Sequence, residues 1–239
     1  MPPRLGLNVD HVATLRQARR ARHPDPLAAA LCGELAGAAQ ITCHIRGDRR
    51  HIQDDDLARL RAAVQTLLNV ELAVTDEMLA IARSLRPHRV TLVPERPGEV
   101  STEGGLDVVR HREAVAHFAA AMQAVGVRVS LFVDPEPAQV QASVLPGVDM
   151  IELNTAAYAE GGGERELERL SVAARQARDA GVEVAAGHGL THHNLPALVT
   201  AVPEIVEYNI GHAIVGRAVF VGLDQAVRDI CRILAGQAP

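Results

Sequence analysis

The chain has 239 residues, of which 48% are hydrophobic and 22% are charged, and its formal net charge is −5 at pH 7. This composition supports a sizeable core and excludes a disordered chain, while the length is close to the ~250 residues typical of an eight-fold barrel. Nucleic acid is not an expected partner, because the net charge of −5 gives no basic footprint and the only aromatic residues are two Tyr and three Phe.

We expect one domain over residues 1–239, a cytoplasmic location and no membrane partner. No apolar stretch approaches the ~18 residues of a membrane span, and the N-terminal segment lacks the apolar core of a signal peptide. Cys32, Cys43 and Cys231 show no CxxC spacing, which fits a reducing compartment and argues against a disulfide framework or a thiolate zinc site.

All 24 basic residues are arginines, and the chain contains no lysine. A Schiff-base aldolase, a transaldolase and a pyridoxal-phosphate enzyme each need a lysine amine that attacks a carbonyl group. The sequence therefore excludes these classes, and any imine chemistry must take its amine from a substrate.

Eight short apolar runs predict strands, and each of them reaches an ionisable or amide side chain. In chain order they are LGLNVDH, QITCHIR, LLNVELAV, HRVTLVPE, VRVSLFVD, VDMIELNT, VEVAAGHG and IVEYNIGH. Segments with helical periodicity alternate with them, at residues 26–37, 54–66, 76–85, 107–125, 136–144, 164–180, 194–201 and 223–235. The alternation is typical of parallel strands joined by crossover helices. The count of eight favours an α/β fold, an eight-stranded parallel (β/α)8 TIM barrel with a few additional helices, over an open doubly wound sheet.

Two connecting segments are longer than a minimal barrel requires. Residues 12–25 are expected to form a loop in which no acidic residue balances Arg16, Arg19 and their neighbouring arginines before Asp25, and this favours an anion-binding role. Residues 95–106 are rich in Gly, Glu and hydroxyl side chains, which is typical of a mobile flap over the mouth of a barrel.

Polar side chains two residues apart share one face of four predicted strands. The pairs are Asn8 and Asp10, His44 and Arg46, Asn69 and Glu71, and Glu152 and Asn154. If each pair points inward, these groups gather at the carboxyl ends of the strands, where enzymes of this architecture hold their site. Burying so many charged groups without partners or a ligand would be unfavourable, so we expect a catalytic site there.

The last two strands end in glycine and histidine, as GHG at residues 187–189 and GH at residues 211–212. Glycine lets backbone N–H groups approach an anion closely, and the loops after strands seven and eight are the usual phosphate site of such barrels. The segment HIRGDRRHI, residues 44–52, adds guanidinium groups that bind phosphate in a bidentate manner and would repel a divalent cation.

Two other classes of protein are compatible with these residues. A metal-dependent barrel hydrolase or class II aldolase would be built on His44, Glu71, Glu152 and His188. A non-catalytic barrel that binds a phosphorylated metabolite is the other, although recognition alone needs fewer titratable groups than are present.

Six motifs, in order along the chain, resemble those of the pyridoxine 5′-phosphate synthase family. They are NVDHVATLRQAR, ITCHIRGDRRHI, NVELAVTDEMLAIA, LVPERPGEVSTEGGLDV, AAGHGLTHHN and NIGHAIVGRAVFVGL. The resemblance implies a cytoplasmic enzyme of vitamin B6 biosynthesis, an eight-fold barrel that assembles as a homo-octamer and uses no metal or organic cofactor. It also implies a transferase reaction on two small phosphorylated substrates. In that reaction 3-amino-2-oxopropyl phosphate (aminoacetone phosphate) and 1-deoxy-D-xylulose 5-phosphate condense to pyridoxine 5′-phosphate, inorganic phosphate and water, and the substrate amine agrees with the missing lysine.

The resemblance further implies roles for individual residues. The implied catalytic residues are His44 and Glu71 as general bases, His188 as general acid and Glu152 as a charge that stabilises the transition state. The implied ligands of aminoacetone phosphate are Asn8, Arg19, Gly189, Gly211 and His212. The implied ligands of deoxyxylulose phosphate are Asp10, His11, Arg46, His51 and a hydroxyl group of Ser101 or Thr102. Asn154 stands where the family pattern has a histidine, a difference expected to change local proton transfer but not the reaction.

Overall fold

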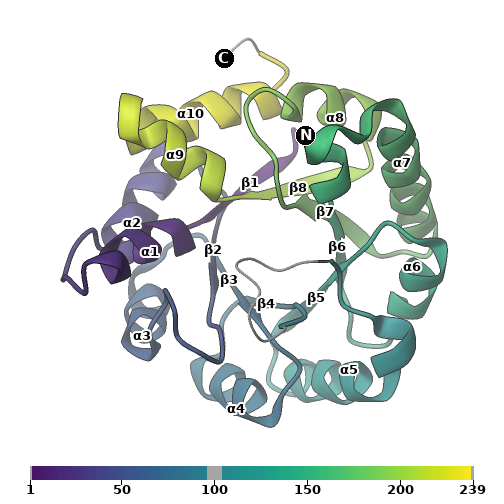
Figure 1. Ribbon diagram of the computed structural model, residues 1–239. Coiled ribbons are helices and arrows are strands. Elements are labelled where there is room, and N and C mark those ends of the chain that lie inside the picture. Colours follow the sequence, from purple (N-terminus) through teal and green to yellow (C-terminus); the bar gives the residue numbers. More distant parts are fainter. Residues whose placement is uncertain (1, 96–103, 238–239) are drawn as a thin grey trace.

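The computed structural model describes residues 2–95 and 104–237, and within them eight strands close into a barrel (Figure 1). The strands are β1 (Arg4–Asn8), β2 (Gln40–His44), β3 (Leu67–Leu72), β4 (Arg89–Leu92), β5 (Arg128–Val133), β6 (Met150–Asn154), β7 (Glu183–Gly187) and β8 (Ile205–Ile210). Each strand pairs in parallel with the next one along the chain, and β8 pairs with β1 to complete the ring. Because parallel neighbours need long crossovers, the helices lie outside this ring. The predicted eight-stranded parallel (β/α)8 TIM barrel is confirmed.

Eight helices lie at the predicted helical segments, within a few residues at each end. They are α2 (Pro26–Ala36), α3 (Asp54–Ala63), α4 (Asp76–Leu85), α5 (Val108–Gln123), α6 (Pro137–Ser143), α7 (Gly163–Asp179), α8 (Leu195–Ala201) and α10 (Leu223–Leu234). The additional elements are α1 (Asp10–Ala18), a short π-helical segment η1 (Tyr158–Gly162) and α9 (His212–Val221). Across the part of the chain that the structure describes, no helix has the length and apolar character that a membrane crossing requires.

The prediction of a loop over residues 12–25 is wrong at its start, because α1 continues to Ala18. The residue before α1 is Val9, whose side chain cannot cap a helix, so no local sequence signal marks the start of this helix. By contrast, α2 begins at a recognisable cap: the Asp25 carboxylate accepts a hydrogen bond from the Leu27 N–H at 3.0 Å, and Pro26 follows it.

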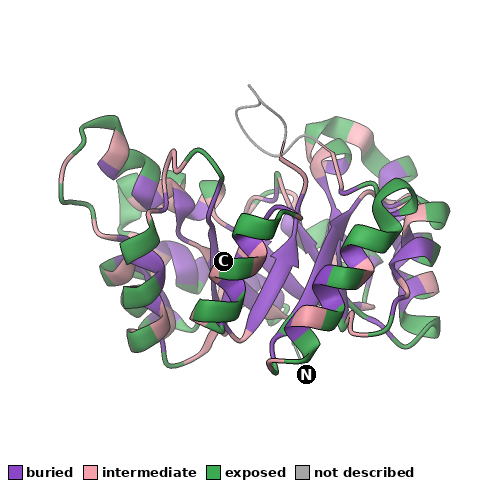
Figure 2. Cartoon of the chain, turned by 90° about the horizontal axis from the view of Figure 1, so that it is seen from below, coloured by how far each residue is buried: buried purple, intermediate pink, exposed green. Residues whose placement is uncertain are grey.

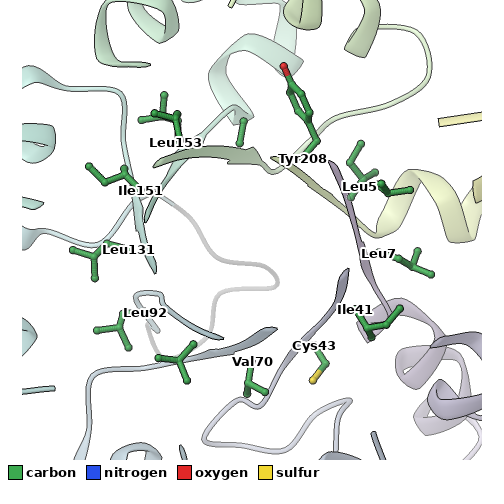
Figure 3. Close-up of a cluster of buried hydrophobic side chains, with 14 of the residues drawn as sticks. Leu5, Leu7, Ile41, Cys43, Val70, Leu92, Leu131, Ile151, Leu153 and Tyr208 are labelled. Atoms are coloured by element: carbon green, nitrogen blue, oxygen red, sulfur yellow. The ribbon is translucent and has the colours of Figure 1, made fainter. Parts of the chain in front are cut away.

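The apolar core lies between the barrel and the surrounding helices. Figure 3 shows side chains that point outward from the strands into this layer: Leu5, Leu7, Ile41, Cys43, Val70, Leu92, Leu131, Ile151, Leu153 and Tyr208. Along each strand these residues alternate with inward-facing ones, as the two-residue repeat of a strand requires. Most strand residues are therefore buried, whereas the helices expose their outer faces (Figure 2).

The inward faces of the strands carry polar side chains that contact one another across the ring. The Arg89 guanidinium on β4 donates hydrogen bonds through Nη1 to Glu207 Oε1 on β8, at 2.6 Å, and to Gln40 Oε1 on β2, at 3.1 Å. These strands are not neighbours, so the contacts pass through the interior of the barrel. Arg89, Gln40 and Glu207 are at most 1% exposed, and such buried charges persist only when they are paired.

A second buried ion pair fastens α1 to the barrel wall. Arg16 Nη1 and Nη2 donate to the two carboxylate oxygens of Asp56, in the first turn of α3, at 2.7 and 2.6 Å. Arg16 Nη2 also donates to the backbone oxygen of His51 at 3.1 Å. Arg16 is therefore committed to a structural contact, which argues against the anion-binding role that its place in the sequence suggested.

We expect Arg16→Met to lower the free energy of unfolding by ~3–5 kcal/mol, because it leaves the Asp56 carboxylate buried without a partner. Urea unfolding followed by circular dichroism measures this change. Arg228→Met on α10 is the matched control, since Arg228 pairs with Asp224 on an exposed helix face and its loss is expected to leave the free energy of unfolding almost unchanged. Equal effects of the two substitutions would contradict the importance of the buried pair.

Candidate active site

The carboxyl ends of the strands open on a cavity of about 570 Å³, a volume that suits a small ligand. Many of the predicted site residues line this cavity: Asn8, His11, Glu71, Glu152, His188, Gly189, Gly211 and His212. They come from strands or strand ends spread around the ring, so residues far apart in the sequence converge at one rim.

His44 lies beside the cavity, between two carboxylates. Its Nδ1 atom is 3.9 Å from Glu71 Oε2, and its Nε2 atom is 2.9 Å from Glu95 Oε1. The backbone N–H of His44 donates to Asp10 Oδ1 at 2.8 Å, which fixes the end of β2. Burial opposes ionisation of Glu95, but hydrogen bonds from His44 and from the Gly47 N–H outweigh it, so the pKa of Glu95 is lowered. Glu95 was predicted only as a strand end, and its contact with His44 was missed.

Asp10 stands at the start of α1, where the strand β1 has already ended. Its Oδ2 atom accepts a hydrogen bond from Asn8 Nδ2 at 2.9 Å, and its own backbone N–H donates to Asn8 Oδ1 at 2.8 Å. Possible ligand atoms of Asp10, His44 and Glu71 lie within 4.8 Å of one another, close enough for them to hold a metal ion. Among the described residues this is where a cation would best fit.

The remaining predicted ligands lie at varied distances from the cavity. His51 is near His44, with their ring centroids 6.0 Å apart, and its Nδ1 atom accepts from the Ile52 N–H at 2.9 Å. Arg46 is buried close to the end of β2, with Nε 3.9 Å from Asp48 Oδ1. Arg19, at the end of α1, is exposed and does not line the cavity.

The hydroxyl residues and the flap predicted after β4 cannot be placed at the cavity, and Asn154 does not line it. Ser101, Thr102 and most of the flap expected at residues 95–106 lie outside the described residues. Asn154, although it is on the inward face of β6, is used in local structure. Its amide donates to Asp134 Oδ1 at 2.9 Å, and its oxygen accepts from the Ala156 N–H at 3.0 Å.

His188 is held in a strained backbone conformation, with φ of +85°, a value that non-glycine residues rarely adopt. The Thr155 hydroxyl lies 2.8 Å from the Gly187 oxygen and 2.6 Å from the His188 oxygen, so it anchors this turn. Gly189 follows with φ of +74°, and a Cβ atom there would lie 2.5 Å from Ala159 Cβ. Burial lowers the pKa of His188, although Glu160 acts in the opposite direction.

Features that favour an anion meet near the start of α9. Gly211 precedes this helix, whose first backbone N–H groups and dipole favour negative charge. The rings of His11 and His212 pack edge to face there, with centroids 4.9 Å apart. Burial, and to a lesser degree His212, lowers the pKa of His11, while Asp10 acts in the opposite direction.

Two carboxyl groups face the cavity, the half-buried Glu71 on β3 and the buried Glu152 on β6. Burial raises the pKa of Glu71 well above its usual value, and the negative charges of Glu152 and Asp10 raise it further. Burial also raises the pKa of Glu152 to about 7, although Asn209 Nδ2 donates a hydrogen bond to its Oε2 atom at 2.8 Å. Glu152 can therefore exchange protons near neutral pH. Asn209 was not predicted as a site residue.

The fold and the site together define a (β/α)8 barrel whose carboxyl-terminal rim gathers histidines, carboxyl groups and a helix N-terminus around one cavity. At the level of the fold, the chain is similar to 3-keto-L-gulonate-6-phosphate decarboxylase from Vibrio cholerae O1 biovar El Tor, with a TM-score of 0.68, 12% sequence identity and 100% of each chain covered. The family described as pyridoxal phosphate biosynthesis protein PdxJ matches residues 5–236, and the chain belongs to this family.

Relatives within the family extend over almost the whole chain. A protein from Geobacter sp. (strain M21) is 52% identical over 235 residues, which cover 97% of this chain and 98% of the relative. A protein from Desulfatibacillum aliphaticivorans is 51% identical over 226 residues, which cover 95% and 96%, respectively. Both relatives are named pyridoxine 5′-phosphate synthase.

We expect Glu152→Gln to be more stable than the wild type at high pH, because glutamine has no carboxyl proton to lose. The pKa of Glu152 is about 7 in the folded chain against 4.5 as its reference, so between these values the folded state binds more protons than the unfolded state. The bound proton therefore stabilises the folded state fully below pH 4.5, the reference pKa. This stabilisation is lost as the pH rises through the folded-state pKa of about 7, and the loss is on the order of 3 kcal/mol. The Glu152→Gln variant does not lose stability in this way, because its side chain does not ionise.

Urea unfolding of wild type and Glu152→Gln at about pH 5 and about pH 8 measures the difference. The variant should gain stability relative to wild type only at the higher pH. Glu113→Gln makes the same chemical change on the exposed face of α5 and serves as the control. A stability difference that is equal at the two pH values would contradict the raised pKa.

Proposed function

We propose that this chain is a pyridoxine 5′-phosphate synthase that condenses 3-amino-2-oxopropyl phosphate with 1-deoxy-D-xylulose 5-phosphate. The products are pyridoxine 5′-phosphate, inorganic phosphate and water. The observation that carries the proposal is the convergence of Glu71, Glu152 and His188 on one cavity, in a lysine-free member of this family.

In the proposed reaction the amine of 3-amino-2-oxopropyl phosphate attacks the ketone of the sugar phosphate and forms an imine as water leaves. No protein amine is needed, which agrees with the absence of lysine. Loss of phosphate, closure of the ring by a carbon–carbon bond and aromatisation then require several proton transfers. These steps need groups that titrate near neutral pH.

We assign His44 and Glu71 as general bases and His188 as general acid. The adjacent His44 and Glu71 side chains suit successive proton transfers at one part of the cavity. The lowered pKa of His188 makes its imidazolium form a stronger acid, which favours proton donation to a leaving group. Glu152, on β6 beside the strand that leads to His188, is assigned to stabilise positive charge in the transition state.

We assign the two phosphate groups to adjoining parts of the rim, because Asn8 contacts Asp10 and His212 contacts His11. Aminoacetone phosphate would lie at the start of α9, near Asn8, Gly189, Gly211 and His212, where helix N–H groups favour an anion. Deoxyxylulose phosphate would lie near Asp10, His11, Arg46 and His51, with a hydroxyl group of Ser101 or Thr102. Because Arg19 is exposed and outside the cavity lining, its assignment to aminoacetone phosphate requires a rearrangement of residues 19–25 or a neighbouring copy of the chain.

The proposal also includes a cytoplasmic, homo-octameric enzyme that acts on small phosphorylated substrates without a membrane or nucleic-acid partner. It includes no metal or organic cofactor. The nearby arrangement of Asp10, His44 and Glu71 favours one second candidate, a metal-dependent barrel hydrolase or aldolase. Elemental analysis of protein purified without added ions, together with assays after chelator treatment, distinguishes the two: stoichiometric zinc and activity lost with it would support the second candidate.

Mixing the purified protein with both substrates tests the proposed function directly. Absorbance of the new pyridine ring and release of inorganic phosphate should appear together, and omission of either substrate should abolish both signals. Phosphate release without a pyridine product would contradict the proposal and favour hydrolysis.

We expect His188→Asn to lower kcat about 100-fold while KM for each substrate stays within about twofold, because the change removes a proton donor but not a phosphate ligand. Steady-state kinetics of the condensation measure both constants. His193→Asn is the control, since it makes the same substitution on the exposed part of the same loop, outside the cavity. A near-normal kcat in His188→Asn would contradict its assignment as the general acid.

A further inference from the structure

We propose that Gln40 and Arg89 are positioning residues, which orient the Asn209 amide so that it donates a hydrogen bond to Glu152. Neither residue lines the cavity. They act from deeper in the barrel, through a chain of contacts that leads from the Arg89–Glu207 ion pair to the rim. This inference rests on the proposed function, because Glu152 is assigned there to the chemistry.

The chain of contacts begins with two groups whose hydrogen-bonding roles are fixed. A guanidinium group can only donate, and an ionised carboxylate can only accept. Arg89 Nη1 donates to Glu207 Oε1 at 2.6 Å, and both side chains are at most 1% exposed. The pair therefore presents a defined donor and a defined acceptor to the next residue inward.

Gln40 contacts both members of this pair, and they allow only one orientation of its amide. Its Oε1 atom accepts from Arg89 Nη1 at 3.1 Å, and its Nε2 atom donates to Glu207 Oε1 at 3.1 Å. If the amide were turned over, nitrogen would face the guanidinium and oxygen would face the carboxylate. The Gln40 Nε2 group is consequently directed toward Asn209, as a donor.

The Gln40 Nε2 group in turn fixes the orientation of the Asn209 amide. Its Oδ1 atom lies 3.1 Å from Gln40 Nε2 and 3.2 Å from the Thr42 hydroxyl oxygen, and it accepts from both. The Nδ2 group must then point the other way, where it donates to Glu152 Oε2 at 2.8 Å. A neutral donor at this position favours the ionised form of Glu152, the form that can stabilise positive charge.

Two glycines leave the space that this arrangement requires. A Cβ atom at Gly6 would lie 2.0 Å from Asn209 Oδ1, and a Cβ atom at Gly187 would lie 2.2 Å from Glu152 Oε1. Any larger residue at either position would displace the amide or the carboxylate. The barrel wall is thus shaped around these two side chains in their observed positions.

The charged surroundings of Glu152 do not replace the donor. The negative charge of Glu207 on β8 opposes ionisation of Glu152, and the positive charge of Arg89 on β4 favours it. Glu71 on β3 is a further carboxyl group whose own ionisation is disfavoured, and His188 reaches the same cavity after β7. Loss of the Asn209 donor would therefore leave Glu152 buried beside the Glu207 carboxylate, which favours its protonated form.

The test removes the orienting groups without touching the cavity. Gln40→Met removes the amide at similar volume, Thr42→Val removes the second donor to Asn209, and the double variant removes both. Thr91→Val is the control, because Thr91 is also buried inside the barrel and its hydrogen bond, to Asn69 Oδ1 at 2.9 Å, lies outside this chain of contacts.

We expect Gln40→Met to lower kcat about fivefold with little change in KM, and the double variant to lose more than the two single effects combined. The acid limb of the kcat–pH profile should move to higher pH, because Glu152 is then protonated more readily. Thr91→Val should leave the position of this limb unchanged. A variant that merely reduces the folded fraction would lower the amplitude of the profile without moving the limb.

A direct titration separates failure of this inference from failure of the proposed function. The Glu152 carboxyl signal, identified in ¹³C NMR spectra by its loss in Glu152→Gln, should titrate at higher pH in Gln40→Met than in wild type. This readout needs no substrate, so it also applies if the wild-type protein does not make the pyridine product. An unchanged Glu152 titration, or an unmoved acid limb in an active Gln40→Met variant, would overturn the inference. If Gln40→Met does not fold, Thr42→Val is judged by the same two measurements.

Discussion

The ion pair of Arg89 and Glu207 joins opposite strands through the middle of the barrel, where neither group can reach bulk water. A closed ring of eight strands forces half of the strand side chains into such an interior. Most barrels fill it with branched apolar residues. Here, polar groups occupy much of it, and several of them contact a partner from another strand. Hydrogen bonds connect this ion pair to the rim, because Arg89 donates to Gln40, Gln40 donates to Asn209, and Asn209 donates to Glu152.

The side chains at the rim lower the stability of the folded chain. Glu152 is buried and Glu71 is half-buried, and each resists ionisation because its charged form is poorly solvated. His188 is held with a positive φ, a backbone conformation that is unfavourable for a residue other than glycine. These features destabilise the folded chain locally and are tolerated because the apolar layer between strands and helices is extensive. Such a division between a stabilising outer layer and an unfavourable rim is expected where proton transfer is the task.

The barrel could be predicted from the sequence because its signals are local: β-branched runs of strand length alternate with helical segments. The inward direction of Asn8, Asn69, Glu71 and Glu152 followed from the two-residue repeat of a strand. The helix α1 could not be predicted, since the residue before its start is Val9, whose side chain cannot cap it. The contact of Glu95 with His44 depends on the path of the chain after β4, and no local pattern encodes that path. Asn154 shares the inward face but is used by Asp134 and Ala156, a competition that is visible only in three dimensions.

The exclusive use of arginine as the basic residue has a physical consequence that links fold and chemistry. An arginine side chain stays charged in every environment of a protein, so it cannot transfer protons, but it can neutralise a buried carboxylate permanently. Arg16 and Arg89 do this for Asp56 and Glu207, each with a carboxylate that is at most 2% exposed. Proton transfer at the rim is thereby left to histidines and to carboxyl groups without an arginine partner. Glu152 is one of these, and a neutral amide contacts it instead of a guanidinium. A guanidinium in that place would lower the pKa of Glu152 far below neutrality, whereas the amide leaves it at about 7, where the group responds to small changes in its surroundings.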